Sequence, residues 1–172
     1  MDRRQSKWNT NTEYIIKKAT KRLFLLKVLK IYHSPVNDMK RFYTAVIRPI
    51  LEYGAQVWNG SLTKDQSNNI ERIQKRELGI IYSEYDYDRA LNHAQLTTLK
   101  DRRDHICVNL IKRMSNPHHK LHNLLPEKIG QVRERETMSN GHKYYNFKTK
   151  TERFRRSPIA YAIDEYNRTL SP

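Results

Sequence analysis

Helix-breaking residues are scarce in this chain, which contains five glycines and six prolines in 172 residues. That is about half the usual share, and a β-sandwich or barrel needs turn residues at short, regular intervals. The pattern therefore predicts an all-α fold. Only 37% of the residues are hydrophobic, but eleven tyrosines, four phenylalanines and two tryptophans are among them. We expect these to form a modest core, so the chain is not expected to be disordered.

Capping signals and apolar spacing predict four main helices. The first begins at the Thr10 to Glu13 capping sequence and runs to about Tyr32. The second continues across Pro49 with a kink. The third begins at a Thr63 cap, with Gln66 at the reciprocal position, and the fourth runs from Leu99 to Met114. Phe24, Leu25 and Val28 widen the apolar surface of the first helix, so its second half is expected to pack on two sides.

The C-terminal part has a different pattern. Residues 143–156 mix six basic residues with aromatic side chains and are interpreted as an extended arm or hairpin. Ser157 and Pro158 predict the start of a short last helix. The expected organisation is a helical region over 1–82, an acidic connector and long helix over 83–116, and a basic aromatic arm with a short terminal helix over 117–172.

The formal net charge is +15, from 33 Lys and Arg against 18 Asp and Glu. The excess lies at the two ends of the chain, in residues 1–31 and 117–172. A polyanion is therefore the first partner to consider, because each Lys or Arg placed on a phosphate releases counterions. An anionic membrane surface is a less favoured alternative. No run of eighteen apolar residues occurs, so no membrane-spanning segment is expected.

Few residues offer catalytic or metal-binding chemistry. The single cysteine, Cys107, lies on an apolar helical stripe and is interpreted as a buried, inert thiol. It excludes an internal disulfide and indicates a reducing compartment, so we expect an intracellular protein of the nucleus or cytoplasm that is not secreted. The remaining candidates are weak and have simpler explanations. His118, His119 and His122 could form a zinc site, but a role in a loop or at a helix start is the simpler interpretation. Glu84, Asp86 and Asp88 could hold Mg²⁺ in a small nuclease, but a helix cap explains them more simply, and Arg48 with Glu52 is interpreted as an ion pair.

Binding is therefore the favoured function class, with no cofactor, metal or small-molecule substrate expected. Basic residues on one face of the first helix could meet phosphates, and aromatic residues of the arm could stack on bases. The alternative is a solvated helix face and an arm whose aromatics, Phe147 and Phe154 above all, pack on the protein's own core. The predicted nucleic-acid-binding residues are Lys17, Lys18, Lys21, Arg22, Lys143, Tyr144, Lys148, Lys150, Arg153, Arg155 and Arg156.

Four blocks of residues follow one another along almost the whole chain. They are Trp8 to Thr12 with Ile16 to Ala19, Arg22 and Leu23; Tyr43 with Ile47 to Tyr53, Val57 and Trp58; Ile70 to Arg76 with Ile80 and Ile81; and Leu99, Arg102 and Arg103 with His119 to Pro126, Lys143, Tyr144 and Thr151 to Phe154. In this order they resemble the C-terminal part of the reverse transcriptase of non-LTR (LINE-type) retrotransposons of the jockey and chicken-repeat kind.

The resemblance implies a thumb-like helical bundle that follows the fingers and palm of an RNA-directed DNA polymerase. Lys17, Lys18, Lys21 and Arg22 match the thumb's basic helix and would face an RNA or RNA–DNA duplex. The family's catalytic aspartates, which use Mg²⁺ in the full-length enzyme, lie in an Asp-Asp turn that would precede Trp8, and this sequence contains no Asp-Asp pair. We therefore expect a non-catalytic fragment that binds nucleic acid. The alternative is a helical scaffold or interaction piece that depends on the missing palm and fingers.

Overall fold

The structure is a computed structural model that describes residues 3–132 and 142–170, with side chains described over 10–130 and 142–170. It is all-α, and the described residues contain no strand, only an isolated antiparallel bridge between Lys128 and Tyr144. The helices are α1 (Arg3–Ile31), α2 (Val36–Phe42), η1 (Tyr43–Ile47), α3 (Arg48–Glu52), α4 (Ala55–Trp58), η2 (Asn59–Ser61), α5 (Lys64–Ile81), α6 (Tyr87–Ala94), α7 (Leu99–Met114), η3 (His122–Leu124), α8 (Ile129–Val132), α9 (Glu152–Arg155) and α10 (Pro158–Thr169).

The chain forms two compact units. Unit 1 comprises Met1–Tyr53 and Leu62–Arg102, and unit 2 comprises Gly54–Ser61 and Arg103–Pro172. These divisions differ from the expected boundaries at residues 82 and 116. The physical reason is long-range packing. In unit 1, α5 packs with α1 and α6 packs with α5, whereas α4 and η2 pack with the C-terminal helix α10 in unit 2.

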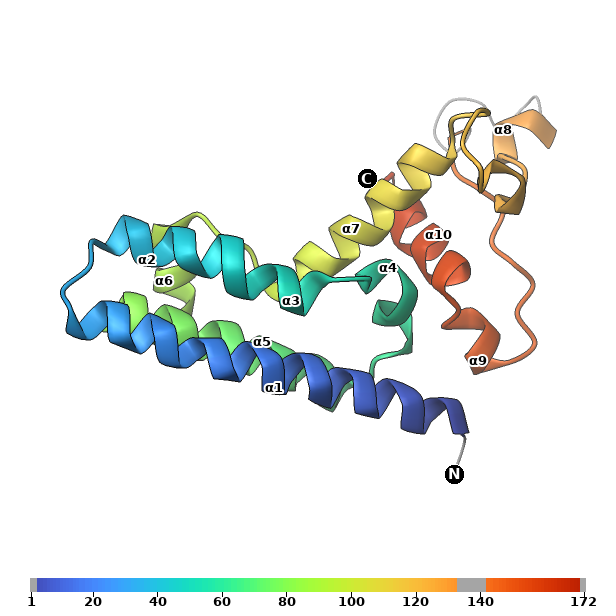
Figure 1. Cartoon of the computed structure of the whole chain (residues 1–172). Helices are drawn as coiled ribbons and strands as arrows, with labels where there is room; N and C mark the ends of the chain where they lie inside the picture. Colours follow the sequence, from blue (N-terminus) through green and yellow to red (C-terminus); the bar gives the residue numbers. More distant parts are fainter. Residues whose placement is uncertain (1–2, 133–141, 171–172) are drawn as a thin grey trace. The chain divides into compact units, whose positions relative to one another are not determined.

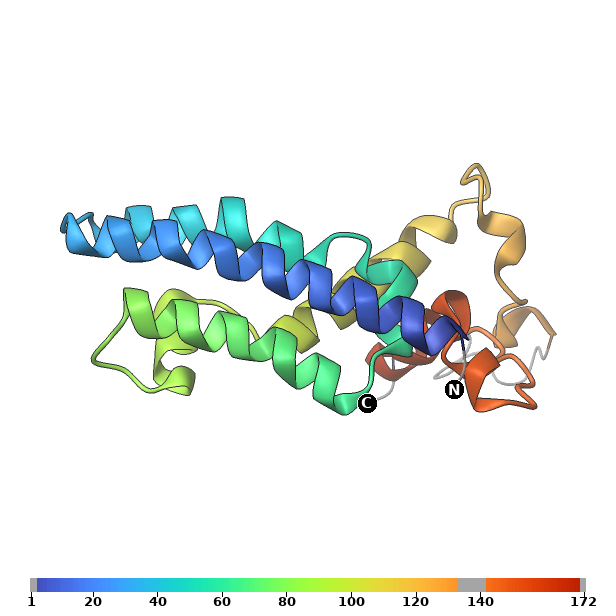
Figure 2. The same ribbon diagram turned by 60° about the horizontal axis from the view of Figure 1, so that its bottom comes forward.

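In unit 1, α1 lies alongside α5 and also alongside the helical segment from α2 to α3 (Figures 1 and 2). The apolar stripe predicted for the first helix faces this core: Ala19, Leu23 and Leu26 are buried. Helix α5 begins at the predicted cap, because the Thr63 hydroxyl accepts the Gln66 N–H at 3.2 Å and the Gln66 side chain accepts the Thr63 N–H at 2.8 Å.

Two local predictions in unit 1 require correction. Helix α1 begins at Arg3, not at the Thr10 cap, and Thr12 is buried within it. A capping sequence satisfies a helix start but does not impose one when the preceding residues also favour helix.

The kink expected at Pro49 takes the form of a π-helical turn, in which the Arg48 N–H bonds to the Tyr43 carbonyl five residues earlier. This wider turn keeps the helix continuous although Pro49 has no N–H to donate.

A chain of hydrogen bonds connects the elements of unit 1. The Tyr43 hydroxyl donates to the Gln74 side-chain oxygen, and the Gln74 amide donates to Tyr87 and to the Thr97 carbonyl, both at 3.0 Å. Tyr87 in turn donates to Glu71, whose carboxylate accepts the backbone N–H groups of Leu99 at 3.1 Å and Lys100 at 3.3 Å. Glu71 of α5 therefore supplies acceptors for the first turn of α7.

Unit 2 has its own apolar cluster, formed by α7, α10 and the segment before α9. Cys107, Ile111, Met114, Tyr144, Ala162 and Ile163 are its buried members. The prediction of a buried thiol is confirmed, and burial raises the pKa of Cys107 to about 12. Helix α10 begins at Pro158 as predicted, although the Ser157 side chain makes no capping hydrogen bond.

Candidate nucleic-acid interface

The predicted basic face of α1 is exposed. Lys17, Lys18 and Lys21 all point away from the buried stripe of the helix, whereas Arg22 is half-buried at its side. The Lys18 ammonium lies 5.8 Å from the centre of the Tyr14 ring. Within the described residues, no carboxylate forms an ion pair with these four basic side chains. Their positive charge is therefore available to an anionic partner.

The second half of the same helix face is apolar and exposed. Phe24, Leu25, Ile31 and Tyr32 all keep large accessible surfaces. Helix α1 packs against both α5 and the α2 to α3 segment, but Phe24 and Leu25, which were expected to widen the packed surface, stay exposed. These exposed apolar residues lie on the same side of the helix as Tyr14 and the three lysines.

The arm contains one residue whose predicted role requires correction. Tyr144 is only 3% exposed, and its hydroxyl lies 2.6 Å from that of Ser115. Its backbone is held by the Asn167 side chain, which accepts its N–H at 3.0 Å and donates to its carbonyl at 2.9 Å. The Lys143 carbonyl accepts the Ile129 N–H at 2.9 Å. Tyr144 is thus a core residue of unit 2, and its ring is not available for stacking on a base.

The other basic residues of the arm lie at the surface. Lys148, Lys150 and Arg153 are exposed, and Lys143 is half-buried. Arg155 and Arg156 are exposed but share one carboxylate, Glu152, at 3.6 and 2.9 Å. The arm is only partly extended, because Thr151 caps the short helix α9 that contains Arg153 and Arg155.

The aromatic residues of the arm mainly serve packing. The rings of Phe147 and Phe154 meet edge to face with centres 5.8 Å apart, and Phe147 packs against the cluster of unit 2. Phe154 remains partly exposed. This confirms the core-packing interpretation for Phe147, whereas Phe154 lies at the surface against the Phe147 ring.

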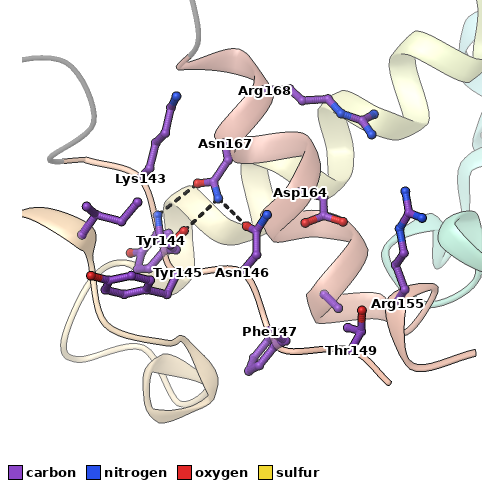
Figure 3. A pocket seen from close by; sticks show the side chains of 12 residues that line it. Lys143, Tyr144, Tyr145, Asn146, Phe147, Thr149, Arg155, Asp164, Asn167 and Arg168 are labelled. Atoms are coloured by element: carbon purple, nitrogen blue, oxygen red, sulfur yellow. Dashed lines mark hydrogen bonds between the residues drawn. The ribbon is translucent and has the colours of Figure 1, made fainter. Parts of the chain in front are cut away.

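A groove of about 730 Å³ lies between the arm and α10 (Figure 3). Lys143, Arg155 and Arg168 line it, but so does Asp164, and Arg168 is paired with Glu165 at 2.6 Å. Its charges are therefore mixed, which makes it a weaker anion site than the face of α1. The Asn167 amide also donates to the Asn146 side-chain oxygen at 2.7 Å. Together with its bonds to the Tyr144 backbone, this contact holds the segment from Tyr144 to Asn146, which lines the groove.

The weak metal candidates have structural roles. Asp86 caps α6 by accepting the Arg89 N–H at 2.8 Å, as the simpler interpretation predicted. His122 Nδ1 lies 2.8 Å from the Met114 carbonyl oxygen, and His119 Nδ1 accepts the Leu121 N–H at 3.2 Å. Among residues 3–132 and 142–170, no group of three His, Cys, Asp or Glu side chains is placed to hold a metal ion.

Sequence reasoning missed two features of charged residues in unit 1, namely the contact of Glu52 with Arg102 and the burial of Glu77. Glu52 pairs with Arg48 at 3.5 Å as predicted, but its shorter contact, 2.6 Å, is with Arg102, fifty residues away. Glu77 of α5 is fully buried, and within the described residues neither of its carboxylate oxygens has a hydrogen-bond partner. A Glu within an apolar helical stripe is the only signal that the sequence offers for it.

In comparisons with known proteins, no protein family, characterised protein or solved structure matched this chain. The resemblance described above therefore rests on the four blocks of residues alone. In the part that the structure describes, no helix is both long and apolar enough to cross a membrane.

Proposed function

We propose that this chain is a non-catalytic C-terminal, thumb-like part of a non-LTR retrotransposon reverse transcriptase, and that it binds RNA or RNA–DNA duplex through α1. The four sequence blocks support the family, and the charge of +15 supports the class of partner. The observation that carries the binding proposal is the set of three exposed lysines, Lys17, Lys18 and Lys21, without ion-pair partners among the described residues.

Their spacing suits a phosphate backbone. Lys17 and Lys21 are one helical turn apart, about 6 Å along the axis, and Lys18 lies beside them on the same face. Lysine acts on phosphate as a mobile point charge and carries no base preference. Binding should therefore follow the shape and charge of a duplex and not its sequence.

The test is the salt dependence of binding to a fluorescent RNA–DNA hybrid, measured by anisotropy. Replacing Lys17, Lys18 and Lys21 by Ala should make the slope of log affinity against log salt shallower by about 2 to 3, because each phosphate contact contributes about 0.9. A matched control replaces Lys64, Lys75 and Arg76, which are exposed on α5, by Ala. Equal losses in both variants, or no loss in either, would refute the assignment to α1.

The non-catalytic part of the proposal has a separate test. The sequence lacks the paired aspartates that hold Mg²⁺ in the family, and phosphoryl transfer depends on such charge stabilisation. The purified chain should not extend a primer on an RNA template when Mg²⁺ and nucleotides are supplied. Incorporation that follows the polypeptide through purification would refute this part while leaving nucleic-acid binding intact.

A second candidate function is a helical interaction piece that needs the missing polymerase palm and fingers. The exposed side chains of Phe24 and Leu25 favour it, because folded monomers rarely leave large apolar patches open. Co-expression with a palm and fingers segment from the same class of element should raise the soluble yield and give a complex. Replacing both residues by Ser should abolish the complex, and an unchanged complex would exclude this face.

A further inference from the structure

The outer face of α1 carries a regular row of side chains. We define this outer face as the residues Tyr14, Lys17, Lys18, Lys21, Phe24, Leu25, Val28 and Ile31 of α1, together with Tyr32 directly after its end. Three apolar members are strongly exposed, Phe24 by 67%, Ile31 by 70% and Tyr32 by 78%, whereas Val28 is half-buried. The opposite face of the helix is already buried in unit 1, so α1 is apolar on both sides over its second half.

The spacing of the outer face indicates the shape of what would cover it. Its residues recur at steps of three and four, so that Tyr14, Lys21 and Val28 are seven apart, and so are Phe24 and Ile31. This is the repeat by which one helix packs along another, with side chains of each fitting between those of its partner. A helix lying along α1 could place its own side chains between these residues.

Charge decides which kind of helix fits. The first half of the outer face carries Lys17, Lys18 and Lys21, and the only acidic residue in α1 is Glu13. A second copy in parallel would place these lysines against one another. An antiparallel copy would place its lysines against the apolar half of the outer face, where they would meet no carboxylate. Carboxylates opposite the lysines would instead give favourable pairs across the interface.

We propose that the outer face of α1 is the docking site for an amphipathic helix of a protein partner. That helix would be apolar opposite the segment from Phe24 to Tyr32 and acidic opposite Lys17, Lys18 and Lys21. The inference goes beyond both candidate functions, because its partner is a protein helix that need not come from a polymerase. Since it uses the lysines that the first candidate function assigns to a duplex, the two partners would exclude each other on this face.

The test uses three synthetic peptides and the full chain, with binding measured by fluorescence anisotropy. The first peptide is a helix about three heptads long, with leucines in a heptad stripe and glutamates beside one end. The second has the same composition in scrambled order, and the third keeps the stripe but has lysines in place of the glutamates. The first peptide should bind at least about tenfold more tightly than either of the others.

Variants of the chain locate the site. Replacing Phe24 and Ile31 by Ser should abolish binding of the first peptide, and replacing the three lysines by Ala should weaken it and reduce its salt dependence. A matched control replaces Val57 and Leu124, two exposed apolar residues of unit 2, by Ser. All of these side chains are exposed, and circular dichroism should confirm unchanged helix content for every variant.

Four outcomes would overturn the proposal. Equal binding of the scrambled acidic peptide would mean that charge alone attracts it, and equal loss in the control variant would place the site elsewhere. Sedimentation of the chain as a dimer that Phe24→Ser dissociates would assign the face to a second copy. Loss of RNA–DNA binding in the Phe24 and Ile31 variant, without peptide binding by the wild type, would assign the face to nucleic acid.

Discussion

The buried carboxyl group of Glu77 makes the stability of unit 1 depend on pH. Glu77 is fully buried in α5, and within the described residues no donor reaches either carboxylate oxygen. Burial disfavours the charged form and raises the pKa of Glu77 from 4.5 to about 9. In the folded chain the group therefore holds its proton at neutral pH, whereas in the unfolded chain it has released it.

The sign and size of the effect follow from this difference. Between pH 4.5 and 9 the unfolded state binds fewer protons than the folded state, so the free energy of unfolding falls as pH rises and is largest below pH 4.5. Each pH unit is equivalent to about 1.4 kcal/mol, so the loss is about 1 kcal/mol at pH 5 and about 3 kcal/mol at pH 7. That is a substantial part of the 5–15 kcal/mol of stability typical of a domain.

Glu77→Gln removes the titration while keeping the shape of the side chain. The buried amide adds a cost that does not change with pH, so the informative quantity is the pH dependence. The free energy of unfolding of Glu77→Gln relative to wild type should rise by about 2 to 3 kcal/mol from pH 5 to pH 7. Urea unfolding followed by circular dichroism measures this free energy of unfolding at each pH, and hydrogen exchange of α5 amides assigns the change to unit 1.

The control is Glu84→Gln, at an exposed position before α6. It should leave the pH dependence of unfolding as it is in the wild type. A difference between Glu77→Gln and wild type that stays constant from pH 5 to pH 7 would show that Glu77 is ionised in the folded chain, and would refute the reasoning from burial.

Three further predictions concern local structure. Thr63→Ala removes the acceptor for the Gln66 N–H and should lower the free energy of unfolding by about 1 kcal/mol in urea titrations. An unchanged free energy of unfolding would show that the cap does not stabilise α5. Gly60→Ala places a Cβ 2.7 Å from Cβ and Cγ of Tyr161, so it should destabilise unit 2 by about 1 to 3 kcal/mol, and an unchanged thermal midpoint would contradict this. The buried Cys107 thiol, with its raised pKa, should react with a disulfide reagent at pH 8 only when urea unfolds the chain, and rapid reaction of the native protein would disprove its burial.

The sequence predicted what depends on neighbouring residues. The Thr63 capping box and the Asp86 cap each involve four consecutive residues, and the buried stripe of α1 spans a few consecutive turns. The structure confirms each of them. The exposed lysines of α1 follow from the same periodicity, since they fall opposite the stripe. The all-α class follows in turn from the long helical patterns and the scarcity of glycine and proline.

Contacts between distant residues could not be predicted in this way. Tyr144 looked like an aromatic residue in a basic arm, and only its packing against α7 and α10 shows it to be core. The contact between Glu52 and Arg102, and the assignment of residues 54–61 to unit 2, likewise depend on tertiary packing. The π-helical turn before Pro49 is a compromise between a missing donor and a continuous apolar face, which periodicity alone does not distinguish from a kink.

The contacts of Glu71 with the first turn of α7 limit how the chain can be shortened. Two backbone N–H groups of that turn, on Leu99 and Lys100, have as their acceptor Glu71, which lies twenty-eight and twenty-nine positions earlier in the sequence. A polypeptide that starts after α5 would lose this acceptor and keep local contacts in which Thr98 accepts the N–H groups of Asp101 and Arg102. Its α7 should fray at the first turn, so a shortened form meant to keep α7 whole has to retain α5.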